Sequence, residues 1–236
     1  MRLALVAAAV AVALAGASAR AAPQHLRVLF VGNSLTATND LPATVAAYAR
    51  AVGRVHLDVA SYAPGGYALE DHWADGAARG LLAQGGWDAV VLQQGPSSLP
   101  ASRANLIEWT RRWAVEARAH GARPALLTVW PERARLPVFP AVIANHRAAA
   151  AAARAASFPA GAAWWDLLRR PAPPPLYGTD GFHPSPLGTY LTAAVVYTGL
   201  TGELPERLPR AVGGLRISAA TAMRLRAAVA RAYAAR

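Results

Sequence analysis

The fold is decided at residues 26–36, which read LRVLFVGNSLT. The apolar, partly β-branched run Leu26–Val31 is typical of a buried strand, and Gly32-Asn33 marks a turn directly after it. Helical spacing follows over residues 41–52, with Pro42 at a first-turn position where its missing N–H costs nothing. A buried strand, a polar turn and a helix in this order predict the first unit of an α/β fold.

The rest of the chain repeats this alternation. Further strands are predicted at residues 55–61, 87–93, 124–130 and 162–166, and further helices at residues 70–83, 102–120, 140–156, 186–198 and 218–235. The strands are continuous apolar runs, which favours a parallel sheet with helices on both faces. We therefore predict a three-layer α/β/α, flavodoxin-like domain around a central parallel sheet of about five strands.

Composition narrows the function classes. The chain has 236 residues, 54% of them hydrophobic, a formal net charge of +11 and no cysteine. Its length favours a single domain, and the missing cysteine excludes disulfides, thiolate metal sites, a cysteine nucleophile and an acylated-cysteine anchor. All 24 basic residues are arginine, a bias typical of GC-rich coding, so the charge is a weak guide to partners. Because basic and aromatic residues are not interleaved, no nucleic-acid partner is expected.

The N-terminus has the features of a signal peptide. Arg2 precedes the apolar run Leu3–Ala15, and Ala17-Ser18-Ala19 is a small-x-small cleavage site. We predict a signal peptide over residues 1–19, with cleavage as late as residue 22, and one domain over residues 23–236; an alanine-rich N-terminal helix is the alternative. The apolar run is too short to span a bilayer. The expected product is exported, periplasmic or secreted, without a transmembrane anchor after processing.

Candidate catalytic residues follow the predicted strands, where parallel sheets bind their ligands. They include a serine, two glycine turns, an amide cluster and an Asp/His pair, which together match the needs of acyl transfer. They lie at residues 32–36, 65–66, 93–98, 130–132 and 177–184. The spacing of Asp180 and His183 lets the carboxylate fold back onto one imidazole nitrogen while the other faces a serine.

Two motifs together resemble the SGNH/GDSL hydrolase family. Gly32-Asn33-Ser34-Leu35 resembles the Gly-Asp-Ser block of that family, with Asn33 in place of aspartate, and Asp180-Gly181-Phe182-His183-Pro184 resembles its Asp-x-x-His block. The resemblance implies the SGNH-hydrolase fold, with Ser34 as nucleophile, His183 as general base and Asp180 as its orienting partner. No cofactor or metal is expected.

The resemblance also implies an oxyanion hole made by the backbone N–H groups of Ser34 and Gly66 and an asparagine side chain. That asparagine is absent, because the corresponding block is Gly95-Pro96-Ser97-Ser98. Gln94 is the expected substitute, and the alternatives are Gln93 and Ser97. Losing such a donor costs about 100- to 1000-fold in rate, so an enzyme needs a substitute. The residues expected in the pocket are Asn33, Gln93 and Trp130.

The sequence supports three functional hypotheses. The first is a secreted serine esterase or acyl-hydrolase acting through an acyl-enzyme on a small-molecule or polysaccharide ester, with O-acetylated carbohydrate favoured. The second is a non-catalytic ligand- or polysaccharide-binding protein that keeps the SGNH fold, suggested by the missing asparagine. The third is an envelope protein held by its C-terminal arginines. A metal site at Glu70, Asp71 and His72 is disfavoured because no second histidine stands at i+4. Oligomeric state is left open.

Overall fold

A five-stranded parallel sheet forms the centre of the molecule. The structure, a computed structural model, describes residues 24–235, and the predicted signal peptide lies outside them. The strands are β1 (Gln24–Val31), β2 (Val55–Tyr62), β3 (Ala89–Leu92), β4 (Arg123–Leu127) and β5 (Ala156–Phe158). Their order, β2-β1-β3-β4-β5, is that of flavodoxin-like folds and confirms the predicted sheet. Within the described residues, no helix is long and apolar enough to cross a bilayer.

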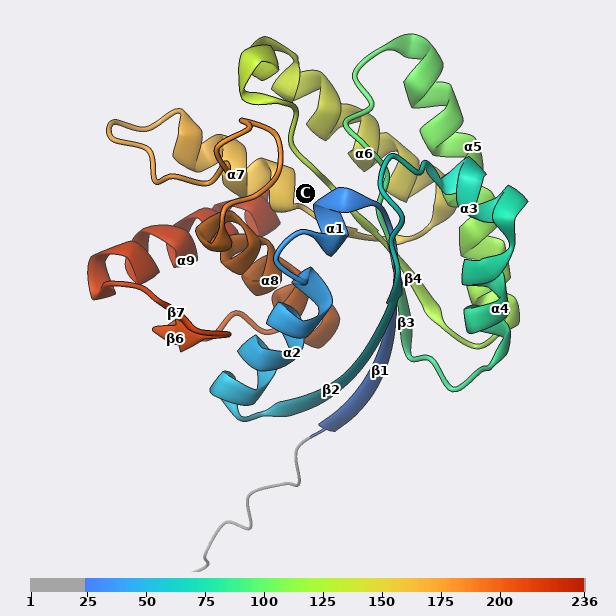
Figure 1. Cartoon of the computed structure of the whole chain (residues 1–236), viewed down its shortest axis with the longest axis horizontal. Helices are drawn as coiled ribbons and strands as arrows, with labels where there is room; N and C mark the ends of the chain where they lie inside the picture. The colour runs from blue at the N-terminus through green and yellow to red at the C-terminus, as the bar shows by residue number, and fades with distance from the viewer. Residues whose placement is uncertain (1–23, 236) are drawn as a thin grey trace, which may run out of the picture.

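Helices cover both faces of this sheet, as Figure 1 shows. One face carries α2 (Leu41–Val52), α7 (Ala160–Leu168), α8 (Pro186–Thr201) and α9 (Ala219–Ala234), and the other carries α3 (Leu69–Asp75), α4 (Ala77–Ala83), α5 (Pro100–Ala119) and α6 (Phe139–Ala153). Successive β1 side chains alternate between these layers, because Val28 and Phe30 join the first cluster while Leu29 and Val31 join the second. The three-layer prediction is confirmed.

Three short elements complete the chain. Helix α1 (Ser34–Ala37) follows β1 directly, and a 3₁₀ turn, η1 (Arg133–Val138), precedes α6. Strands β6 (Ala211–Val212) and β7 (Leu215–Arg216) form a small antiparallel hairpin that the sequence pattern did not indicate.

The predicted strand at residues 162–166 is wrong, because this segment lies inside α7. The buried residues Ala160, Ala163, Trp164 and Leu167 recur at helical spacing, and a short apolar run cannot distinguish a strand from a buried helix. The fifth strand is the preceding residues 156–158. The predicted helix at 70–83 is two helices, divided at Gly76, whose φ of 81° is left-handed.

Candidate active site

Ser34 stands at the carboxyl end of β1, where it is the first residue of α1. Asn33 starts this helix as its N-cap, since its side-chain oxygen accepts the Leu35 N–H at 3.1 Å. The Ser34 side chain is half-buried. A capped turn at the strand end therefore presents the serine at the edge where parallel sheets bind ligands.

The side chain of Gln93 accepts two hydrogen bonds from this turn. Its Oε1 accepts the Asn33 N–H and the Thr36 hydroxyl, both at 2.8 Å. The same oxygen leaves no room for a side chain at residue 32, because a Cβ on Gly32 would lie 2.6 Å from it. Gln93 is 1% exposed, and its Nε2 has no hydrogen-bond partner among the described residues. Gln93, expected in the pocket, is thus a buried anchor of the nucleophile turn.

Asn33 joins the nucleophile turn to the second predicted block. Its Nδ2 donates to the Tyr67 carbonyl oxygen at 2.9 Å, so residues 33–34 lie beside residues 66–67. Gly66 is exposed and has a φ of 79°, a left-handed conformation that glycine adopts without steric cost. The structure therefore brings the two segments that carry the expected backbone donors to the same edge of the sheet.

Gln94 is engaged by two neighbouring helices. Its Oε1 accepts the Leu69 N–H at 3.0 Å, and its Nε2 donates to Asn105 Oδ1 at 3.1 Å. Because a primary amide carries two N–H bonds, one remains for another acceptor. The hydroxyl of Ser97, the other side-chain alternative in this loop, donates to the Gly95 carbonyl at 3.2 Å.

The side chains of Asp180 and His183 are hydrogen-bonded to each other. His183 Nδ1 lies 2.5 Å from Asp180 Oδ2, and Asp180 Oδ1 accepts the backbone N–H groups of Phe182 and His183 at 2.9 and 3.0 Å. The Phe182 N–H, followed by the His183 ring, lowers the pKa of Asp180 to about 2. An ionised carboxylate only accepts hydrogen bonds, so Nδ1 carries the proton and Nε2 is the basic nitrogen.

The loop that carries this pair rests on the end of β4. Trp130 Nε1 donates to the Phe182 carbonyl at 3.0 Å, and the Arg133 N–H donates to the Gly181 carbonyl at 2.8 Å. Trp130, expected in the pocket, is only 1% exposed because its ring stacks on Trp164 at 3.7 Å between centroids. The Trp130 ring packs in the core, and its indole N–H anchors the loop that carries Asp180 and His183.

Asn39 attaches the same loop to the segment that carries the serine. Its Nδ2 donates to the Pro184 carbonyl at 2.8 Å and contacts Thr189 Oγ1 at 2.9 Å. Sequence reasoning missed this residue. The available signal was an asparagine in the polar stretch Thr38-Asn39-Asp40, and in the structure Asn39 has a left-handed φ of 55°, a conformation in which asparagine is enriched. Among the described residues no hydrogen bond joins Ser34 Oγ to His183. The bonds of Asn39 connect their two segments instead. Catalytic hydrogen bonds are often long before substrate binds.

An open depression of about 510 Å³ lies beside Asp180. Its walls are polar and charged side chains together with the loop itself, and the lining residues are Glu132, Arg133, Ala134, Thr179, Asp180, Gly181 and Phe182. Glu132, Arg133 and Thr179 are exposed. Neither Ser34 nor His183 lines this depression, which lies on the Asp180 side of the Asp/His pair.

No protein-family model and no curated protein matches this chain. Solved structures do match it. A candidate SGNH hydrolase from Slackia heliotrinireducens is 26% identical with a TM-score of 0.62, over 75% of this chain and 100% of the other. A DUF4886 family protein from Bacteroides uniformis is 17% identical with a TM-score of 0.70, over 89% and 95%. A variant of an acetyl-xylooligosaccharide esterase from Geobacillus is 16% identical with a TM-score of 0.62, over 77% and 97%.

Proposed function

We propose that this chain, which has the fold of the SGNH hydrolases, is a serine ester hydrolase. The observation that carries the proposal is the Asp180–His183 pair on a loop that Asn39 fastens to the serine-bearing segment. Ionised Asp180 holds His183 in the tautomer whose Nε2 accepts a proton. In this proposal Ser34 is the nucleophile, and His183 Nε2 removes its hydroxyl proton.

The reaction proceeds through an acyl-enzyme. His183 Nε2 takes the proton of Ser34 Oγ as that oxygen attacks the ester carbonyl, and the carbonyl oxygen becomes an oxyanion. Collapse releases the alcohol, which takes the proton from His183, and leaves the acyl group on Ser34. Water then attacks in the same way, giving the free acid and regenerating the serine.

Backbone N–H groups of Ser34 and Gly66 stabilise the oxyanion in this proposal, since hydrogen bonds hold their segments side by side. The uncommitted N–H of Gln94 is the third donor. Its other N–H and its carbonyl are held by Asn105 and Leu69, which orients the amide before substrate arrives.

O-acetylated carbohydrate is the proposed substrate class. The support for this class is that one structural neighbour is an acetyl-xylooligosaccharide esterase. The proposal includes export through the signal peptide at residues 1–19, into the periplasm or out of the cell, where polysaccharide esters occur. A small-molecule or polysaccharide ester, and no nucleic acid, is the proposed partner.

A second candidate is a binding protein with the same fold and no chemistry. It is favoured by the absence, among the described residues, of a hydrogen bond between Ser34 Oγ and His183, whose recorded side-chain partner is Asp180. The two candidates differ in whether Ser34 is activated.

A fluorophosphonate probe measures that activation without knowledge of the substrate. We expect the purified mature protein to be labelled at Ser34, as mapped by mass spectrometry, and Ser34→Ala to abolish labelling. Because a general base contributes about 100- to 10,000-fold, His183→Ala should slow labelling by at least about 100-fold. Ser61→Ala, which changes an exposed serine on β2, is the matched control and should label normally. A folded protein that does not react would refute the hydrolase proposal in favour of the binding protein.

Substrate class is tested separately, by acetate release. O-acetylated oligosaccharides should be cleaved with a higher kcat/KM than aryl acetates or long-chain lipid esters. An enzyme that labels at Ser34 but prefers lipid esters would refute only the carbohydrate assignment.

A further inference from the structure

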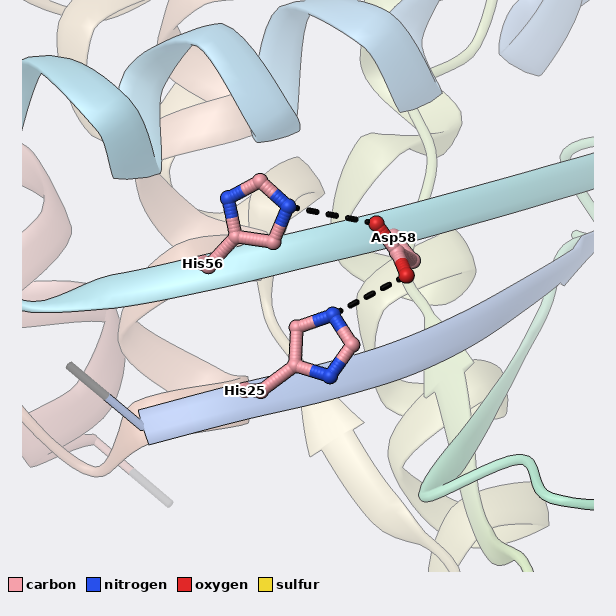
Figure 2. A group of neighbouring side chains, drawn as sticks. All are labelled: His25, His56 and Asp58. Atoms are coloured by element: carbon pink, nitrogen blue, oxygen red, sulfur yellow. Dashed lines mark hydrogen bonds and ion pairs between the residues drawn. The ribbon is translucent and has the colours of Figure 1, made fainter.

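Three side chains of types that can bind metal ions, two histidines and one aspartate, lie together at the opposite end of the sheet from Ser34. His25 lies at the start of β1, and His56 and Asp58 lie at the start of β2, as Figure 2 shows. The strand register pairs His25 directly with His56. Because side chains alternate along a strand, His56 and Asp58 point to the same face, and their contacts with His25 place it there too.

The contacts within this cluster are close. His25 Nε2 lies 2.9 Å from Asp58 Oδ2, and His56 Nε2 lies 3.2 Å from Asp58 Oδ1. The two imidazole rings stack with centroids 5.2 Å apart and planes at 20°. All three side chains are about half exposed to solvent. One ligand atom from each residue lies within 4.8 Å of the other two.

Arg27, the basic residue that pairs with Asp58 in the strand register, directs its guanidinium away from this cluster. Arg27 pairs with Asp58 across the strands, but its guanidinium donates to the carbonyls of Gly85 and Gly86. It also lies 4.7 Å from the centre of the Trp87 ring. The Asp58 carboxylate is therefore left to the two imidazoles.

We propose that His25, His56 and Asp58 bind a divalent transition metal ion of the zinc class. Two imidazoles and one carboxylate are a ligand set that suits Zn²⁺, Ni²⁺ and Cu²⁺, whereas Mg²⁺ and Ca²⁺ prefer oxygen ligands throughout. Because a carboxylate only accepts hydrogen bonds, His25 Nε2 donates to Asp58 Oδ2 at 2.9 Å without metal, and His56 Nε2 contacts Asp58 Oδ1 at 3.2 Å. A metal bonds one atom of each of these side chains in place of that hydrogen bond, and the proton of a neutral imidazole then moves from Nε2 to Nδ1 of the same ring.

The geometry is close to what such an ion needs. Zn²⁺ binds imidazole nitrogen and carboxylate oxygen at about 2.0–2.2 Å, so its ligand atoms lie about 3.3–3.6 Å apart in a tetrahedron. The present spacing approaches this value, and half-exposed side chains on a rigid strand pair can move the remaining distance by rotation about their χ angles. Water completes the coordination. The ion would fasten the start of β1 to the edge strand β2.

Calorimetric titration of the untagged mature protein with ZnCl₂ tests this proposal directly. We expect one Zn²⁺ to bind per chain, detected as a saturable heat of binding. Zinc should raise the thermal unfolding temperature, because a ligand that binds only the folded state stabilises it. MgCl₂ at the same concentration should produce neither effect.

Single substitutions identify the ligands. Replacing even an outer-shell partner costs about 10- to 100-fold in metal affinity, so His25→Gln, His56→Gln and Asp58→Asn should each weaken Zn²⁺ binding by at least about 100-fold. Because all three side chains are exposed, the variants should unfold at the wild-type temperature when zinc is absent. His120→Gln, which changes a partly exposed histidine in the turn between α5 and β4, is the matched control and should bind normally.

Wild-type affinity in all three variants would overturn the proposal. So would loss of binding in His183→Ala alone, because it would place the ion at the Asp180–His183 pair instead. Ser34→Ala should retain full zinc binding, so the outcome is independent of the ester hydrolase proposal.

Discussion

Replacing Gln93 with methionine tests whether this side chain anchors the nucleophile turn. Methionine has a similar length and volume but cannot accept a hydrogen bond. The substitution therefore leaves the buried Asn33 N–H and the Thr36 hydroxyl without the oxygen that each now contacts at 2.8 Å. Packing around the site is largely conserved, because exchanges that keep side-chain volume are the best tolerated.

The expected loss of stability is moderate because two effects oppose each other. Each buried group left unpaired costs about 1–3 kcal/mol, which sums to about 2–6 kcal/mol for the two donors. Gln93 Nε2 is itself buried without a partner, so removing it returns about 1–3 kcal/mol. We expect Gln93→Met to lower the free energy of unfolding by about 1–3 kcal/mol.

Urea unfolding followed by tryptophan fluorescence measures this change, and the rate of fluorophosphonate labelling measures its effect on Ser34. A displacement of about 1 Å at a reacting group costs about 100-fold, so labelling should slow far more than stability falls. Thr36→Val, which removes only one of the two donors, is the matched comparison. In the Gln93→Met background Thr36→Val should cost less than in the wild type, because the hydroxyl there is already unpaired.

Two results would refute this reasoning. One is wild-type stability and labelling in Gln93→Met. The other is strict additivity of the two substitutions, which would mean that Gln93 and Thr36 do not share a hydrogen bond.

Three further predictions concern stability. Burial lowers the pKa of His146 to about 4 from 6.5, so the folded state keeps it neutral, and up to about 3 kcal/mol of stability should be lost as pH falls from 6.5 to 4. His146→Gln should reduce the dependence of the urea unfolding midpoint on pH between 6.5 and 4. An unchanged pH dependence would contradict the view that His146 causes it. Burial disfavours ionisation of Asp166, but hydrogen bonds from Arg170 and Arg231 outweigh it and lower its pKa to about 2 from 3.8. Asp166→Asn should therefore cost about 1–2 kcal/mol at pH 7, after allowance for solvent screening, and the difference from wild type should vanish as pH falls through 3.8 to 2; a constant difference would exclude the ion pairs as its cause. Gly161→Ala would place a Cβ 2.2 Å from a backbone carbonyl oxygen, so its thermal unfolding temperature should drop by an amount equivalent to about 1–3 kcal/mol, whereas wild-type stability would show that this strand end can move.

Local spacing was sufficient to predict the fold class and the contact between Asp180 and His183. Short apolar runs predicted the central strands, and their continuous rather than alternating pattern indicated a sheet covered on both faces. Asp180 and His183 are three residues apart, and their contact forms within a single loop. Both features depend only on residues that are close together in the sequence.

Residues whose surroundings come from distant segments were not predictable in the same way. Trp130 was expected to line a pocket, yet it stacks on Trp164, which α7 supplies. Gln93 and Gln94 are adjacent in sequence, but one amide supports the nucleophile turn while the other bonds α3 and α5.

The cluster of His25, His56 and Asp58 shows the same limit most clearly. Its first and last members are 33 positions apart and meet only because β1 and β2 pair in one register. A shift by one residue would turn every side chain of a strand to the other face, so the pairing itself decides which groups meet. That register depends on the packing of both helical layers against the sheet, which only the tertiary structure specifies.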